Sequence, residues 1–248
     1  EPPRVTQSLC CAVVSSSNRP QPEQQAPPVQ WLRVQYAKRG RARFTSHRDF
    51  SRAFDRALRR AGVPMAYSSG FNPHPRVSFA NAAPTGAATE AEYLEIGTSR
   101  VCDPARVQEA LNAALPTGLS VLAVVEGTRG GLADRLVASA WRVEPAGVPD
   151  GLLDEVVPQF LAREGVEVQR MTKNGMRTFD ARAAVVSAAV EDGALRLVIR
   201  HTAPLVRPDD VISAMTVVDD RFAPEGVLLT RLAQGPLDGE SVGDPLAE

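Results

Sequence analysis

The 248-residue chain lacks several features that would place a protein in a class at once. It has three cysteines (Cys10, Cys11 and Cys102) and no CxxC spacing, so a disulfide framework is excluded and a reducing compartment is expected. No apolar run approaches the roughly 18 residues of a membrane span, and the apolar stretch at 9–14 is too short for a secretory signal. These absences predict a cytoplasmic protein without membrane association.

The local signatures of most cofactor enzymes are also missing. The sequence contains no GxGxxG, GxxxxGK[ST], HExxH or CxxxCxxC pattern. No cofactor and no metal ion are therefore expected in this chain, and catalytic motifs alone do not indicate its function.

Charge is distributed unevenly along the chain. Its 28 Lys and Arg residues nearly balance its 29 Asp and Glu residues. Between Trp31 and Ser78, however, eleven basic residues face two acidic ones, a net charge of +9. Segregation of this kind is typical of a surface that binds a polyanion such as RNA, or an acidic protein. A solvated basic helix face without a ligand is the alternative.

The pattern of elements predicts an α+β fold of two tandem ferredoxin-like units, each β-α-β-β-α-β with an antiparallel sheet. Residues 30–127 form the first unit and 137–235 the second. Residues 1–29, rich in Pro, Gln and Ser, are expected to be a disordered leader, and 236–248 an acidic tail outside the folded units.

Alternating or apolar segments predict the strands, and 3.6-residue periodicity predicts the helices. In the first unit the strands are expected at 31–37, 63–68, 77–80, 92–96 and 119–125, with helices at 46–61 and from 103. In the second unit they are expected at 137–143, 179–190, 195–201 and 227–233, with helices at 152–162 and from 207. Pro158 lies inside a predicted helix, which we expect to bend or shorten there.

The first predicted helix has a capped start and one apolar face. Ser46 stands three residues before Asp49, as in a capping box. Phe50, Phe54 and Leu58 recur at the spacing of a buried face, and five arginines lie elsewhere around the helix.

Gly70-Phe71-Asn72-Pro73-His74-Pro75-Arg76 is the least generic segment. Two prolines hold the backbone around His74 extended, and Gly70 gives freedom just before Phe71. Such a loop is equipped to stack on and hydrogen-bond to a nucleotide. Alternatively, Phe71 anchors the loop to the core and His74 binds a backbone carbonyl.

The stretch from Lys38 to Ala80, followed by the EAEYLEI strand, closely resembles the radical-SAM-linked protein family. The resemblance covers residues 31–234 and is strongest over 38–96. In that family such a domain forms the C-terminal part of certain radical SAM proteins, or it is a separate chain encoded beside one. The resemblance therefore implies the stand-alone form, with S-adenosylmethionine and an iron–sulfur cluster held by a separate radical SAM partner encoded nearby.

The leading hypothesis is an accessory, substrate-handling protein for a radical SAM enzyme, plausibly one that binds RNA. The residues predicted to bind substrate are Arg48, Arg52, Arg56, Arg59, Tyr67, Gly70, Phe71, Asn72, His74 and Arg76. Two alternatives stay open. One is a metal-independent RNA-processing or RNA-modifying enzyme with His47 as its catalytic base, and the other is an interaction domain for an acidic protein.

Overall fold

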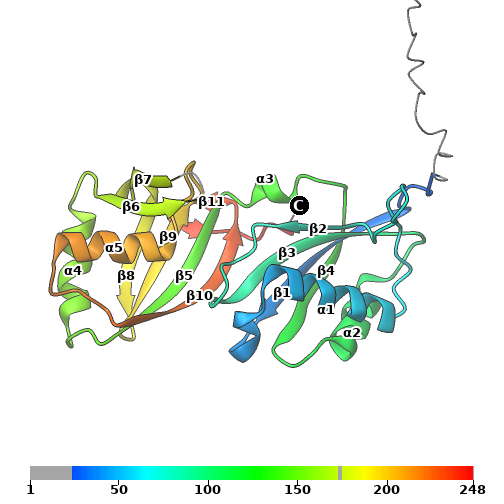
Figure 1. The fold of residues 1–248 in the computed structure, drawn as a ribbon, viewed down its shortest axis with the longest axis horizontal. Coiled ribbons are helices and arrows are strands. Elements are labelled where there is room, and N and C mark those ends of the chain that lie inside the picture. Colours follow the sequence, from blue (N-terminus) through cyan, green and yellow to red (C-terminus); the bar gives the residue numbers. More distant parts are fainter. Residues whose placement is uncertain (1–23, 173–174, 248) are drawn as a thin grey trace, which may run out of the picture.

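The computed structural model describes residues 24–172 and 175–247. In this part of the chain the fold is α+β, as predicted, with a mostly antiparallel sheet and five α-helices (Figure 1). Most of the predicted leader, residues 1–23, lies outside the described residues. No helix in the described ranges is long and apolar enough to cross a membrane.

The first half of the chain contains four strands and two longer helices in the predicted order. They are β1 (Gln30–Lys38), α1 (His47–Arg60), β2 (Val77–Ala80), β3 (Ala88–Thr98), α2 (Pro104–Ala114) and β4 (Leu119–Gly127), with a 3-10 turn at Gly40–Phe44. The strand expected at 63–68 is reduced to isolated bridges from Met65 to Thr98 and from Tyr67 to Pro75. A short helix, α3 (Leu132–Arg135), lies in the connection to the second half.

The second half repeats this order with one insertion. Its elements are β5 (Ala138–Ala146), α4 (Leu152–Leu161), β6 (Glu167–Thr172), β7 (Gly175–Asp180), β8 (Val185–Glu191), β9 (Ala194–Arg200), α5 (Pro208–Val218) and β10 (Gly226–Gly235). The predicted turn between β8 and β9 is confirmed, with φ of 50° at Asp192 and 69° at Gly193. The β6–β7 hairpin was not predicted, and Phe179 belongs to β7 rather than to β8. Helix α4 continues for three residues past Pro158.

Four strands of each half belong to one eight-stranded sheet, not to two separate sheets, while β6 and β7 form a two-stranded sheet of their own. The order of the eight-stranded sheet is β4-β1-β3-β10-β5-β9-β8. The remaining strand, β2, pairs with the second half of β3, whereas β10 pairs with the first residues of β3. Only β3 and β10 run parallel, and they pair Thr230 with Ala88 and Arg231 with Thr89. The sheet is therefore continuous across the boundary predicted between two units, because β2 covers only Tyr93–Ile96 of β3 and leaves its first residues to β10.

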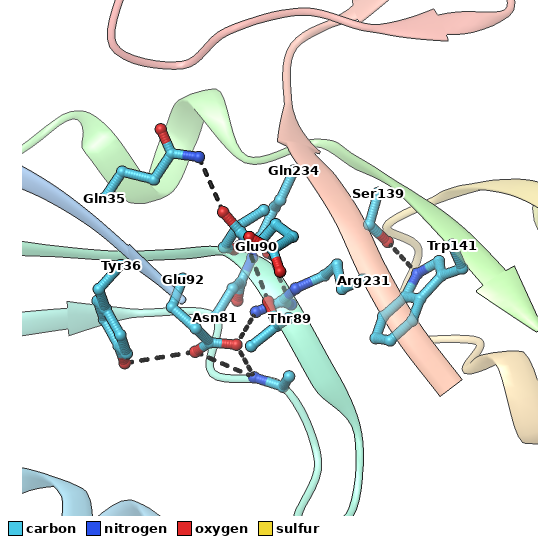
Figure 2. A network of polar contacts seen from close by, with 12 residues as sticks. Gln35, Tyr36, Asn81, Thr89, Glu90, Glu92, Ser139, Trp141, Arg231 and Gln234 are labelled. Atoms are coloured by element: carbon cyan, nitrogen blue, oxygen red, sulfur yellow. Dashed lines mark hydrogen bonds and ion pairs between the residues drawn. The ribbon is translucent and has the colours of Figure 1, made fainter. Parts of the chain in front are cut away.

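Polar side chains are buried at this junction, as Figure 2 shows. The Arg231 guanidinium pairs with Glu92 at 2.5 Å, and Glu92 also accepts hydrogen bonds from the Ala83 N–H and the Tyr36 hydroxyl. Gln234 donates to the Ala91 carbonyl. The two halves thus meet through buried polar contacts as well as through backbone pairing.

Each half has its own apolar core on the helix side of its strands. Phe50, Phe54 and Leu58 of α1 pack with β1 and β3 in the first, and α4 and α5 pack over β5 and β9 in the second. A third, smaller cluster joins Tyr93 of β3 to Leu132 of α3 and Leu246 near the C-terminus.

The segment expected to be a tail outside the folded units is packed against the protein. It forms a small hairpin of β11 (Leu237–Asp238) and β12 (Ser241–Val242), and Leu246 is buried. The composition of 236–248 is acidic and rich in Gly, but burial of one leucine against Tyr93 and Leu132 holds its end in place.

Candidate functional site

The arginines of helix α1 lie on its solvent side because the opposite face of the helix packs against the core. Ser46 caps the helix as predicted, since its Oγ accepts from the Asp49 N–H at 3.2 Å. Phe50 and Phe54 are buried, and the Phe50 ring stacks on Tyr36 of β1 at 4.3 Å between centroids. The charged side chains are left on the opposite, exposed side of the helix.

Residues 66–76, which include the segment from Gly70 to Arg76 singled out above, form a narrow hairpin that we call the 66–76 hairpin. The Ser68 N–H donates to the His74 carbonyl at 2.8 Å, and the His74 N–H donates to Ser68 Oγ at 3.0 Å. Gly70 has a φ of +133°, which favours glycine at this turn. The hairpin is continuous with β2 and is attached to β3, because the Gly97 N–H donates to the Arg76 carbonyl.

Helix α1 and the 66–76 hairpin enclose a cleft of about 400 Å³, which we call the α1–hairpin cleft. Arg52 and Arg59 line it from the helix, and Tyr67 and His74 line it from the hairpin. Phe79 of β2 and Phe54 add an apolar wall. The structure thus brings together four of the residues that the sequence singled out.

The other predicted residues lie outside the cleft lining. Arg48 and Arg56 are exposed on α1, and Asn72 is exposed at the hairpin tip. Arg76 instead donates to the Tyr67 carbonyl and lines a separate hollow beside Trp31.

Phe71 is 68% exposed at the tip of the hairpin. The alternative in which this ring anchors the loop to the core is therefore wrong. An exposed ring on a stiff loop is available for stacking.

His47 is exposed at the first position of α1. Its ring contacts Phe79 edge-to-face at 4.8 Å between centroids. Within the described ranges, no group of three or more His, Cys, Asp or Glu residues is placed to hold a metal ion.

Counting charges along the sequence overstated the basic surface. Arg33 and Lys38 are buried in β1, and Arg33 pairs with Glu95. Burial lowers the pKa of Lys38, although the nearby Glu92 carboxylate raises it. The exposed arginines of this region lie mostly on α1.

Residues that sequence reasoning missed also line the cleft. Asp55 pairs with Arg59 one helical turn away, which neutralises part of the basic character of the wall. Ser51 and Val77 complete the lining. The spacing of Asp55 and Arg59 would have revealed the ion pair from the sequence.

The opposite face of the first-half sheet is partly covered. Leu132 and Leu136 around α3 and Leu246 pack over Ala91 and Tyr93 of β3. A hollow lined by Trp31, Ser78 and Glu95 remains beside this cover.

Comparison with known proteins gives a family but no activity. Residues 31–208 match the model of a family described as "Uncharacterized protein conserved in bacteria (DUF2344)". No curated protein matches the sequence. A solved structure titled "Crystal Structure of an Unknown Protein from Galdieria sulphuraria" aligns over 82% of this chain and 96% of that chain, with 14% identity and a TM-score of 0.26. That similarity is too low to indicate a shared fold or function.

Proposed function

For a chain that belongs to the bacterial family DUF2344, we propose an RNA-binding accessory role, with RNA held at the α1–hairpin cleft and the chemistry done by a separate enzyme. The observation that carries the proposal is the placement of Arg52 and Arg59 opposite Tyr67 and His74 in one cleft. Phe71 stands exposed on the same hairpin.

Two kinds of contact support RNA as the ligand. Arg52, with its neighbours Arg48 and Arg56 on the exposed side of α1, supplies guanidinium groups for phosphate oxygens. The Phe71 ring and the His74 imidazole offer flat surfaces on which unstacked bases can lie. Stacking of this kind requires splayed bases, so the proposed ligand is single-stranded or looped RNA.

We also propose that the two halves are tandem ferredoxin-like units. In each half the sheet order is the fourth, first, third and second strand: β4-β1-β3-β2 and β10-β5-β9-β8. Many RNA-binding domains of this topology use the open sheet face. Here α3 and Leu246 cover part of that face in the first half, and the arginines lie on α1, so the proposal places RNA at α1 instead.

The partnership with a radical SAM enzyme is proposed on the resemblance of the sequence alone. The partner would hold S-adenosylmethionine and the iron–sulfur cluster, and both proteins would be cytoplasmic. Affinity purification of the tagged chain from its own bacterium, followed by mass spectrometry, tests this part. Recovery of no radical SAM protein contradicts it.

RNA binding is tested by fluorescence anisotropy with a labelled single-stranded RNA over a range of salt concentrations. The variant is Arg52→Gln/Arg59→Gln, and its matched control is Arg106→Gln/Arg163→Gln, which changes two exposed arginines outside the cleft. Log affinity falls as log salt rises, and each lost phosphate contact makes this slope shallower by about 0.7. We expect the slope to be shallower by about 1.4 in the cleft variant, which loses two contacts, and unchanged in the control.

Two results would contradict the proposal. In one, the wild-type chain shows no salt-dependent RNA binding. In the other, the cleft variant and its control lose the same affinity. If Arg52→Gln/Arg59→Gln instead abolishes capture of an acidic protein, with no RNA bound at any stage, the interaction-domain hypothesis replaces this one.

A further inference from the structure

A second cavity, of about 140 Å³, lies at the junction of the two halves and shares no residue with the α1–hairpin cleft. Its wall comes from the segment after β2, from β5, from residues 201–208 and from β10. Both halves contribute, so the cavity exists only because β10 and β3 join them into one sheet.

The wall of this junction cavity contains cations and no carboxylate. Arg207 and Arg231 both line it, whereas Glu92, which pairs with Arg231, does not. Arg231 is 4% exposed and donates from Nη2 to Glu92 and from Nη1 to Gln234 at 3.3 Å. Its Nε is buried without a hydrogen-bond partner in the described structure. An unsatisfied buried donor is destabilising.

Three other polar side chains of the cavity form a chain of contacts. Trp141 Nε1 donates to Ser139 Oγ at 2.8 Å, and Ser139 Oγ lies 3.1 Å from His201 Nε2. His201 Nδ1 lies 2.6 Å from the Leu136 carbonyl, which can only accept, so Nδ1 carries a proton. Burial lowers the pKa of His201 against the opposing effect of the Leu136 hydrogen bond, so Arg207 and Arg231 carry the positive charge of the wall.

The rest of the lining is apolar and confines the ligand. Trp141, Pro84 and Leu205 form flat or aliphatic surfaces. A cavity of about 150 Å³ is known to accommodate benzene, so this one fits a body of roughly six to nine non-hydrogen atoms. It is too small for a nucleotide.

We propose that the junction cavity is a binding site for a small organic carboxylate, whose anionic group meets Arg231 and Arg207 and whose body lies against Trp141. Guanidinium groups bind carboxylates through paired, charge-assisted hydrogen bonds. The apolar wall favours a carboxylate with a carbon body over inorganic phosphate. The proposal is independent of RNA binding, because the two sites share no residue.

Trp141 gives this proposal a direct readout. Trp31 and Trp141 are the two tryptophans of the chain, so in a Trp31→Phe background the intrinsic fluorescence reports on the cavity. Benzoate and lactate are titrated as carboxylate probes, with benzamide as the uncharged match to benzoate and inorganic phosphate as a second anion. Thermal unfolding of the full chain is measured alongside.

We expect benzoate or lactate to change the Trp141 fluorescence saturably and to raise the Tm by about 3–6 °C at ten times Kd. Arg207→Gln is expected to weaken that binding about 10- to 100-fold. It should leave the fold intact, because the Arg207 side chain is exposed and makes no cap hydrogen bond. Arg163→Gln, a control outside the cavity, should bind as the wild type does.

Each of four results would overturn the proposal. The first is that neither carboxylate changes the fluorescence or the Tm, and the second is that benzamide binds as tightly as benzoate. The third is that only phosphate binds, and the fourth is that Arg207→Gln binds the carboxylates as tightly as Arg163→Gln does. RNA binding can succeed or fail without affecting any of these outcomes.

Discussion

Arg231 and Glu92 are 139 positions apart in the sequence, yet their side chains pair at 2.5 Å and are 4% and 1% exposed. The pair lies where β10 meets β3, and it links the two halves of the sheet. Burial and the Glu92 carboxylate both raise the pKa of Tyr36, whose hydroxyl donates to Glu92. The Glu92 carboxylate is therefore in contact with both the Arg231 guanidinium and the Tyr36 hydroxyl at the junction.

Replacement of Glu92 by Gln should lower the free energy of unfolding by about 3–5 kcal/mol, because Arg231 would stay buried without a counter-charge. Urea unfolding measures this loss. The matched control is Glu90→Gln, which breaks the exposed Arg39–Glu90 pair and should cost at most about 1 kcal/mol. Equal losses in the two variants would show that the junction pair does not stabilise the fold.

Stability should decrease as the pH falls below about 6.5, in part because of His201. Burial lowers the pKa of His201; the hydrogen bond to Leu136 opposes this shift and the charge of Arg231 adds to it. The unfolded chain then binds a proton that the folded chain does not, which favours unfolding.

Between pH 7.5 and 5.5 this contribution is at most about 1.4 kcal/mol, and it is smaller here because the ring is only partly buried. His201→Gln should therefore lose less stability than the wild type over the same interval. Urea midpoints at the two pH values give the comparison, and parallel losses in both proteins would contradict the assignment.

Replacement of Phe71 by Ala should leave stability within about 0.5 kcal/mol, since the ring is largely exposed. RNA affinity should fall about 5- to 150-fold if a base stacks on the ring, and Phe71→Trp should preserve it. Phe44→Ala removes another exposed ring, outside the cleft, and should not alter binding. Anisotropy titrations of the three variants decide the point, and the same loss in Phe44→Ala as in Phe71→Ala would argue against stacking.

Replacement of Ser46 by Ala should cost about 1 kcal/mol of stability, because the Asp49 N–H at the start of α1 loses its acceptor. Ser46→Asn should retain most of that stability. Urea unfolding of both variants tests the cap, and a Ser46→Ala protein as stable as the wild type would mean that solvent satisfies this end of the helix.

Much of the site near α1 was predictable because its determinants are local. The apolar spacing of Phe50, Phe54 and Leu58 placed the arginines outward, and the prolines on both sides of His74 marked a stiff loop. The sequence could not predict that Arg52 and Arg59, and not the other arginines of α1, line the cleft. That depends on where the 66–76 hairpin lies against the helix.

The sequence by itself determined the alternation of strands and helices, the capped and basic α1, and the β8–β9 turn, because each depends on residues within one or two turns of the chain. The tertiary structure decided that β10 pairs with β3, that Arg33 and Lys38 are buried, and that Leu246 is packed. It also decided that Arg231, Trp141 and His201 line one cavity. These features depend on contacts between residues far apart in the sequence, whose burial and pairing no local pattern encodes.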